Sequence, residues 1–223
     1  MTADLQACPL CRDRHVRAFS RAHGRQFFAC DACRLVYVAS GAHPTPEAES
    51  ARYRTHQNDP SDAAYRAFLD RLAVPLAARL SAGAEGLDYG SGPGPTLSVM
   101  LAERGFPTWV YDPFFSDDET VLGRTYDFVT CTETAEHFFD PGREFDRLQA
   151  LVRPGGWLAV MTEMRREDRP FETWHYARDP THVSFYHPET MAWLADRYGW
   201  LLERPHPNVV LFKTPDLKPR LPA

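Results

Sequence analysis

Two Cys-x-x-Cys pairs near the start of the chain have the residue type and spacing of a metal site. Cys8 and Cys11 form the first pair, Cys30 and Cys33 form the second, and 18 residues lie between the pairs. Each pair can form a tight turn whose thiolates converge, so two turns together supply four sulfur ligands to one zinc ion. A site closed by four sulfurs has no open position for water, and the spacing therefore predicts a structural zinc.

The cysteines have weaker alternative interpretations. Disulfide-bonded or redox-active pairs do not suit a cytosolic chain, whose thiols are kept reduced, and an iron ion can occupy a similar four-sulfur site. The fifth cysteine, Cys131, lies in an apolar run and is expected to be a core residue.

A second stretch, residues 86–96, has the composition of a cofactor-binding loop. It reads Gly-Leu-Asp-Tyr-Gly-Ser-Gly-Pro-Gly-Pro-Thr, and the apolar spacing of a helix continues over residues 97–101. Glycines at Gly90, Gly92 and Gly94 allow a tight turn and let a ligand touch bare backbone. The N-terminus of the following helix directs its free N–H groups into the same space, so strand, glycine loop and helix together predict a binding site.

The glycine spacing discriminates between cofactors. A dinucleotide-binding Gly-x-Gly-x-x-Gly motif starting at Gly90 would need glycine at position 95, which is Pro95; the glycines instead follow Asp88 in an Asp-x-Gly-x-Gly-x-Gly pattern. A strand-like run over residues 108–111 ends in Asp112, and a carboxylate at the tip of a second strand suits the hydroxyls of a ribose. Taken alone, the loop could also be an ordinary turn between a strand and a helix.

The segments after Asp112 follow an order that is typical of one family. Residues 126–131 read as a buried strand, Glu136-His137 and Asp140-Pro141 follow, and a Pro-Gly-Gly turn leads into the next strand at residues 154–156. With the glycine loop, this order resembles the class I S-adenosylmethionine-dependent methyltransferases over residues 84–214. The resemblance implies an α/β fold with a Rossmann-like, doubly wound, seven-stranded sheet, and methyl transfer to a small-molecule acceptor.

The cysteine pairs extend the resemblance to the whole chain. It looks like a family of small bacterial class I methyltransferases with an N-terminal zinc ribbon, whose substrate is not established. The expected organisation is a zinc ribbon over residues 1–40, a linker over 41–60 and a methyltransferase domain over 61–223. A short third strand is expected around residues 120–122. In the linker, Tyr53, His56 and Asn58 either are exposed and inert, which is the expectation, or face the cofactor.

The resemblance also implies which residues bind the donor S-adenosylmethionine. The glycines line it, Asp112 holds its ribose hydroxyls, and Asp88 attracts its methionyl ammonium. The tip of the fourth strand, residues 132–134, is expected near the methyl group or the adenine edge. The full expected donor set is Asp88, Tyr89, Gly90, Gly92, Gly94, Asp112, Pro113, Thr132, Glu133 and Thr134.

Methyl transfer needs an acceptor atom in line behind the methyl carbon, and a general base only if that atom starts protonated. His137 is one candidate base, with a structural role for the imidazole as the alternative. Residues 171–187 are dense in aromatic and imidazole groups and predict a wall facing the acceptor, with Trp174 in it; a self-packed surface loop is the alternative. The rival catalytic candidates there are His175, His182 and Tyr186.

Composition limits the remaining function classes. The net charge is −5, yet residues 1–40 carry six Arg against three Asp, so an RNA methyltransferase that docks RNA through a basic ribbon is an alternative. The net acidity and the presence of only two lysines, Lys213 and Lys218, count against it. A non-catalytic cofactor-binding module is a further alternative.

No apolar run approaches a membrane span and no signal peptide is recognisable, which predicts a cytoplasmic protein. The sequence specifies no oligomeric state.

Overall fold

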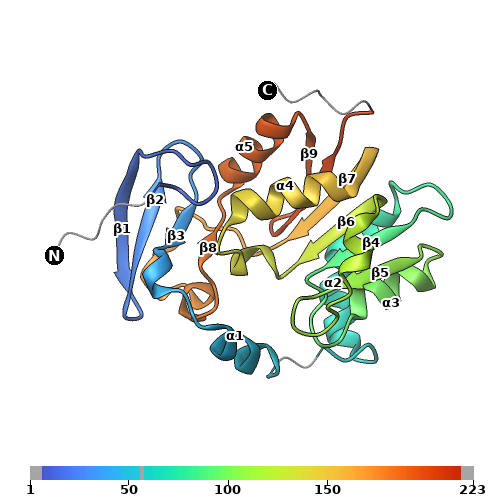
Figure 1. Ribbon diagram of the computed structural model, residues 1–223, viewed down its shortest axis with the longest axis horizontal. Helices are drawn as coiled ribbons and strands as arrows, with labels where there is room; N and C mark the ends of the chain where they lie inside the picture. Colours follow the sequence, from blue (N-terminus) through green and yellow to red (C-terminus); the bar gives the residue numbers. More distant parts are fainter. Residues whose placement is uncertain (1–6, 56–57, 217–223) are drawn as a thin grey trace.

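The computed structural model describes residues 7–55 and 58–216 and contains two sheets. The larger sheet has the order β5-β4-β6-β7-β10-β9 (Figure 1). Its first four strands are parallel to one another. β10 is antiparallel to both of its neighbours, β7 and β9. The strands are β4 (Gly86–Tyr89), β5 (Thr108–Tyr111), β6 (Tyr126–Thr132), β7 (Val152–Met161), β9 (Leu201–His206) and β10 (Val209–Lys213).

Helices cover both faces of this sheet because alternate strand residues point to opposite sides. On β10, Val209 and Leu211 pack into the core beneath α2 and α3, whereas Val210 and Phe212 pack into the core beneath α4 and α5. The helices are α2 (Ala63–Ala77), α3 (Thr96–Glu103), α4 (Pro141–Leu151) and α5 (Pro188–Tyr198). A doubly wound α/β fold is therefore confirmed.

The larger sheet has six strands in the described chain, and the expected seventh is absent there. Residues 120–122, predicted as a short strand, belong to the 3-10 helix η2 (Glu119–Gly123). The Asp118 side chain accepts the Thr120 N–H at 3.0 Å and caps that turn. The prediction was wrong because a parallel crossover needs a dozen or more residues, and the segment between β5 and β6 is too short for a strand as well as a crossover.

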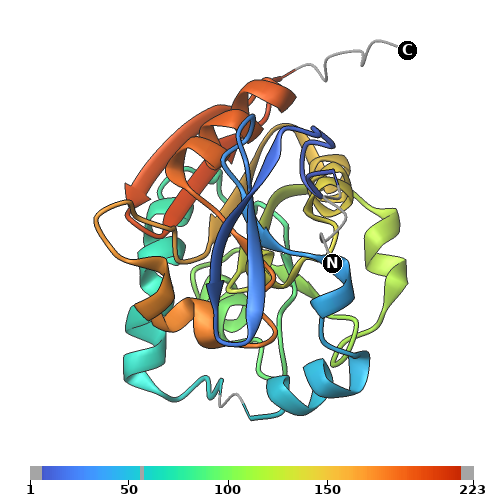
Figure 2. The same cartoon turned by 90° about the vertical axis from the view of Figure 1, so that its left-hand side faces the viewer.

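The cysteine-rich segment forms the smaller sheet, with order β1-β2-β3-β8. β1 (Val16–Ala22), β2 (Arg25–Cys30) and β3 (Val36–Val38) are antiparallel neighbours. The fourth strand, β8 (Ser184–Phe185), comes from the distant C-terminal half and pairs with β3. Figure 2 shows the hairpin of this sheet lying across the rest of the molecule. The cysteine-rich segment is thus built into the main body through a shared sheet.

The expected linker contains regular structure. Residues Pro46–Tyr53 form helix α1, whose N-terminus is capped by the Thr45 hydroxyl accepting the Ala48 N–H. His56, a candidate of the sequence analysis, lies outside the described residues. The remaining short 3-10 helices are η1 (Ser40–Ala42), η3 (Ala135–His137), η4 (Phe171–Thr173) and η5 (His175–Arg178). In the part of the chain that the structure describes, no helix combines the length and apolar character needed to span a membrane.

Candidate functional site

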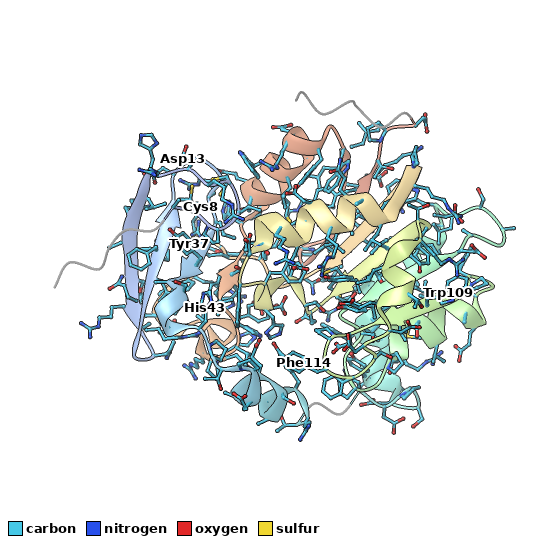
Figure 3. The ribbon with its side chains drawn as sticks, viewed as in Figure 1. Cys8, Asp13, Tyr37, His43, Trp109 and Phe114 are labelled. Atoms are coloured by element: carbon cyan, nitrogen blue, oxygen red, sulfur yellow. The ribbon has the colours of Figure 1, made fainter. Side chains whose placement is uncertain are left out.

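A cavity of about 860 Å³ opens at the carboxyl ends of β4, β5 and β6, the edge at which open α/β sheets bind ligands. The expected donor residues line one end of it. The other end is formed by α1, by η3 and by the segment from His175 to His182. Figure 3 shows Phe114, which also lines the cavity, between α1 and the main sheet. The cavity therefore joins parts of the chain that are remote in sequence.

The glycine loop passes so close to its neighbours that side chains would not fit. Gly90 has φ 77°, and a Cβ there would lie 2.2 Å from Thr134 Cγ2. A Cβ on Gly94 would lie 2.2 Å from the backbone oxygen of Asn58. Asn58 was expected to be exposed and inert, but it lines the cavity and braces this loop. Glycine is needed at both positions to keep the loop's backbone at the cavity wall.

Two buried carboxylates flank the loop. The Asp112 carboxylate accepts the Gly92 N–H at 2.9 Å through Oδ2, and accepts the N–H groups of Phe114 and Phe115 through Oδ1. Asp88 accepts the Thr130 hydroxyl at 2.7 Å. Burial raises the pKa of Asp88 to about 6, so forming its carboxylate is unfavourable unless a cation lies nearby. Asp112 thus ties the glycine loop to β5, and Asp88 supplies a poorly solvated negative charge.

Several buried polar atoms at the donor end lack a partner among the described residues. They are Ser91 Oγ, Thr132 Oγ1 and Glu133 Oε1. Glu133 also has φ 48°, an uncommon conformation for this residue type. Burial, followed by the charges of Glu136 and Glu163, raises its pKa well above the usual range. Unpartnered buried polar atoms are unfavourable, and their clustering on one wall is typical of a ligand site.

The far end of the cavity holds two imidazoles beside a buried carboxylate. Tyr176 and Thr162 donate their hydroxyl protons to the Glu136 carboxylate. The rings of His137 and His182 have centroids 4.8 Å apart. One atom from each of Glu136, His137 and His182 lies within 4.8 Å of the others. A group of this kind can accept a proton or hold a divalent cation.

Backbone carbonyls fix the orientation of both imidazoles. His137 Nδ1 lies 3.1 Å from the Thr181 oxygen, and His182 Nδ1 lies 2.8 Å from the Tyr176 oxygen. A carbonyl only accepts hydrogen bonds, so each Nδ1 carries a proton, and Nε2 is the nitrogen of each ring that can hold a free lone pair. Burial lowers the pKa of His182 to about 4, against the opposing charge of Glu136, so His182 is neutral at physiological pH.

Helix α1 closes this end of the cavity. Tyr53 donates its hydroxyl proton to Glu49 at 2.8 Å, and its ring packs edge-on against His137 with centroids 5.0 Å apart and against Phe114 at 5.4 Å. Burial raises the pKa of Glu49. Arg52 forms an ion pair with Asp179 at 2.7 Å and so attaches α1 to the segment that carries His182.

Two of the four side chains expected to face the acceptor do not. Tyr186 is fully buried, donates to the Ala135 oxygen at 3.0 Å and is not part of the cavity wall. Trp174 is also outside that wall and donates its indole N–H to Glu163. Both predictions are corrected: these rings pack in hydrophobic cores around the site. His175 lines the rim, mostly exposed and 3.1 Å from a Glu163 oxygen, whereas His182 lies inside the cavity.

The cavity residues that were absent from the predicted site include Glu49, Glu136, Tyr176 and Asp179. The Glu136-His137 pair was visible as a motif, and its glutamate could have been included on that ground. Tyr176 and Asp179 lay in the stretch chosen for its aromatic density. Glu49 carried no signal, because a glutamate in a polar stretch is ordinarily a solvated residue.

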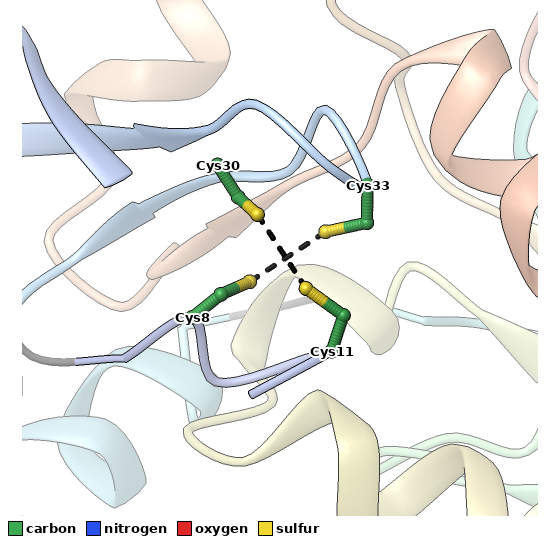
Figure 4. Close-up of side chains that lie close together, drawn as sticks. All are labelled: Cys8, Cys11, Cys30 and Cys33. Atoms are coloured by element: carbon green, nitrogen blue, oxygen red, sulfur yellow. Dashed lines mark hydrogen bonds between the residues drawn. The ribbon is translucent and has the colours of Figure 1, made fainter. Parts of the chain in front are cut away.

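The four paired cysteines converge at one point (Figure 4), and none of them lines the cavity. Cys8 Sγ lies 3.5 Å from Cys33 Sγ, and Cys11 Sγ lies 3.4 Å from Cys30 Sγ. All four sulfurs lie within 4.8 Å of one another, with three of the four residues buried. None of these cysteines is in a disulfide. This is a four-thiolate set of the kind that binds zinc.

The chain is similar to known methyltransferases. A family model described as "Methyltransferase domain" matches residues 54–204. The ubiquinone biosynthesis O-methyltransferase of Photorhabdus laumondii is 35% identical over 91 residues, which are 40% of this chain and 38% of that protein. Its counterpart from Proteus mirabilis is 31% identical over 90 residues, 40% of this chain and 37% of that protein. The matches thus span less than two fifths of these relatives.

Solved structures show the same fold at low identity. The 1,6-didemethyltoxoflavin-N1-methyltransferase of Burkholderia thailandensis, solved with 1,6-didemethyltoxoflavin and S-adenosylhomocysteine, matches with a TM-score of 0.55 and 14% identity, over 90% of this chain and 100% of that chain. An O-methyltransferase family protein from the same organism matches with a TM-score of 0.50 and 17% identity, over 75% of this chain and 63% of that one.

Proposed function

Because the chain belongs to the methyltransferase domain family, we propose that it transfers a methyl group from S-adenosylmethionine to a small-molecule acceptor. The observation that carries this proposal is the cavity itself. Its glycine-lined end and its end with two imidazoles are continuous, so donor and acceptor can meet in one cavity. Positioning of this kind supplies much of the rate of a methyl transfer.

The donor end fits S-adenosylmethionine. The unpartnered Ser91, Thr132 and Glu133 atoms offer hydrogen bonds to a polar ligand. A Cβ on Gly92 would approach the Asn58 amide at 3.2 Å, so the bare backbone leaves room beside the loop. The buried Asp88 favours a cationic partner, which the methionyl ammonium provides, and S-adenosylmethionine supplies the transferable methyl group when bound.

The acceptor end suits a flat molecule that loses a proton. The rings of Tyr53, Phe114 and Tyr176 supply aromatic area on its walls, and such area favours planar ligands. Because Nδ1 of His137 and of His182 faces a carbonyl, Nε2 is the nitrogen of each ring that can accept a proton from a hydroxyl or amine of the acceptor. We assign the base to this pair and leave His175, tied to Glu163 at the rim, as a secondary candidate.

We further propose that Cys8, Cys11, Cys30 and Cys33 bind one structural zinc ion. Four converging thiols and no disulfide support this assignment. The ribbon then comprises residues 1–40, followed by a connection over 41–60 that includes α1 and by the methyltransferase domain over 61–223. Because β8 completes the ribbon sheet, ribbon and methyltransferase domain act as one folded unit.

Calorimetry with S-adenosylmethionine and S-adenosylhomocysteine tests the donor assignment. We expect micromolar binding, on the order of −8 kcal/mol, and none for a nicotinamide dinucleotide. Release of S-adenosylhomocysteine is then measured with a panel of phenols and aromatic amines, using wild type and His182→Gln. Turnover that needs His182 while donor affinity stays unchanged supports the proposal. Tight dinucleotide binding without S-adenosylmethionine binding would refute it.

An RNA methyltransferase is less well supported. Arg12 and Arg17 pair with Asp140 and Asp31, and Arg34 pairs with glutamates of the main body, so much of the ribbon's positive charge is neutralised internally. RNA affinity that falls steeply with salt would favour this alternative. A purely cofactor-binding module would bind S-adenosylhomocysteine but show no turnover with any acceptor class.

A further inference from the structure

Arg25, the first residue of β2 in the ribbon, reaches into the segment that carries His182. Its Nη1 donates to the oxygens of Pro180 and His182 at 3.1 and 2.8 Å, and its Nη2 donates to those of Ala177 and Asp179 at 2.7 and 2.8 Å. One half-buried guanidinium therefore gathers four carbonyls from six consecutive residues.

Two other carbonyls of the same segment, those of Tyr176 and Thr181, orient the imidazoles of His182 and His137. The Tyr176 oxygen accepts the His182 Nδ1–H, and the Thr181 oxygen accepts the His137 Nδ1–H. Thr181 lies between two residues whose oxygens bind Arg25. If the segment turned, the direction of the Thr181 oxygen would change, and His137, which belongs to a different element, would lose its partner.

A guanidinium suits this position better than other side chains. It presents five N–H donors in a rigid plane, whereas a lysine ammonium offers three donors from a single point. Four carbonyl dipoles that converge on one place repel one another unless a cation lies between them. The Arg52–Asp179 ion pair holds the segment from the α1 side, but it contacts only a side chain and leaves the carbonyl directions free.

The ribbon holds Arg25 in place from two directions. The hairpin turn before it has His23 at φ 52° and Gly24 at φ 74°, a tight two-residue turn that fixes where β2 begins. The same strand ends at Cys30, one of the four converging cysteines. Phe27 on β2 packs against Phe171 and Phe185 of the main body, so the strand cannot slide along it.

We propose that Arg25 is a positioning residue for the acceptor end of the site, which keeps the Nε2 lone pairs of His137 and His182 available by holding the carbonyls of residues 176–182. The ribbon thereby has a role in the reaction without contacting either substrate. The identity of these imidazoles as proton acceptors rests on the proposed function; their orientation by Arg25 does not.

The test compares Arg25→Met with Arg21→Met in the full-length, zinc-loaded protein. Both changes remove one arginine from the same hairpin, but Arg21 is exposed on β1. Long-range proton–nitrogen NMR reports which ring nitrogen of each histidine is protonated. In wild type and Arg21→Met we expect Nδ1–H for His137 and His182. In Arg25→Met we expect mixed tautomers for both, with His43, whose Nε2 binds the Val38 oxygen, as the unchanged reference.

Two further measurements separate positioning from general damage. Amide exchange of peptides covering residues 175–183 should rise at least tenfold in Arg25→Met, roughly the effect of opening one local unit. Affinity for S-adenosylhomocysteine should stay within about twofold of wild type, since the donor end lies apart from the segment. Failure of wild type to bind this ligand would count against the proposed function and leave the tautomer result unaffected.

Arg25→Lys keeps the positive charge, and it provides the test if Arg25→Met does not fold. We expect it to show mixed tautomers while retaining its zinc, because one ammonium cannot reach four carbonyls. Unchanged Nδ1–H signals and unchanged exchange in Arg25→Lys and in folded Arg25→Met would overturn the proposal. Equal changes in Arg21→Met would also overturn it.

Discussion

The two ends of the cavity are built in opposite ways. The donor end takes nearly all its polar groups from residues 88–134, at the tips of three adjacent parallel strands. The acceptor end combines α1, η3 and the segment from His175 to His182, with the last braced by the ribbon through Arg25. One end depends on local chain geometry and the other on contacts across more than a hundred residues. Perturbations should therefore affect the two ends separately.

Removing Cys30, one of the four proposed zinc ligands, should have the largest effect. Structural zinc sites supply roughly 10–16 kcal/mol of apparent binding free energy at neutral pH, so Cys30→Ser should lose its metal and unfold the ribbon. We expect increased amide exchange over residues 175–187, while S-adenosylhomocysteine still binds. Elemental analysis, exchange and calorimetry measure the three outcomes.

Cys131→Ala is the control for this change, because Cys131 is buried in β6 far along the chain from the four converging cysteines. It should keep one zinc per chain. If wild type contains no metal when purified reduced, or if Cys30→Ser abolishes donor binding together with acceptor-end protection, the separation of the two ends is wrong.

Gly90→Ala should damage the donor end selectively. An alanine at φ 77° is strained, and its Cβ would overlap the Thr134 side chain at 2.2 Å. Gly105→Ala is the matched control, since Gly105 has φ 86° and open space around it. We expect a loss of about 1–2 kcal/mol from strain alone in the control and about 3 kcal/mol or more in Gly90→Ala. Denaturant unfolding measures both, and only Gly90→Ala should also weaken S-adenosylhomocysteine binding.

Asp88→Asn should stabilise the protein near neutral pH while weakening donor binding. The folded pKa of Asp88 is raised from 3.8 to about 6, so the native state binds more protons than the unfolded state between those values, and stability falls as pH rises through that window. At pH 7 the full penalty is about 3 kcal/mol at 1.36 kcal/mol per unit. Asparagine does not titrate, so the substitution removes this penalty. Unfolding at pH 4 and pH 7 measures the effect.

The exposed Asp196→Asn serves as the comparison for this pH experiment and should show little change. If Asp88→Asn lowered stability at pH 7 and left donor affinity intact, the carboxylate would be a structural hydrogen-bond acceptor for Thr130 instead of a partner for the donor.

The smallest expected effect is that of Asp112→Asn. The variant keeps the shape of the side chain but removes its charge. The carboxylate oxygens of Asp112 accept hydrogen bonds from three backbone N–H groups. A hydrogen bond to a charged group is worth about 1.5–3 kcal/mol, which corresponds to at least a tenfold loss of S-adenosylhomocysteine affinity. Asp117→Asn, on the same loop but exposed, should bind normally. Equal affinity of Asp112→Asn and wild type in calorimetry would contradict this role.

The predictions from sequence agree with the structure where the position of a residue depends on a short stretch of chain. The glycine spacing, Asp112 after its strand and the cysteine pairs each impose a local geometry: the glycines and Asp112 line the cavity, and the four cysteines converge. The predictions failed where packing decides. Tyr186 and Trp174 have side chains that could bind a substrate, but in the folded chain their rings are packed in hydrophobic cores. Nothing in the sequence indicates that Arg25 contacts residues 177–182. Its partners there are backbone carbonyls, which every residue type has, so the contact requires no particular side chains in that segment.

The pairing of β3 with β8 affects the order in which the chain can be completed during synthesis. Residues 36–38 leave the ribosome about 150 residues before residues 184–185, which at ~5–20 residues per second is roughly 7–30 s. Throughout that time one edge of β3 lacks its native neighbour, and an open strand edge invites pairing with other chains. β3 is only three residues long, which limits that risk. A fragment that ends before residue 184 would keep this edge open, so truncated chains should aggregate more readily than the full-length protein.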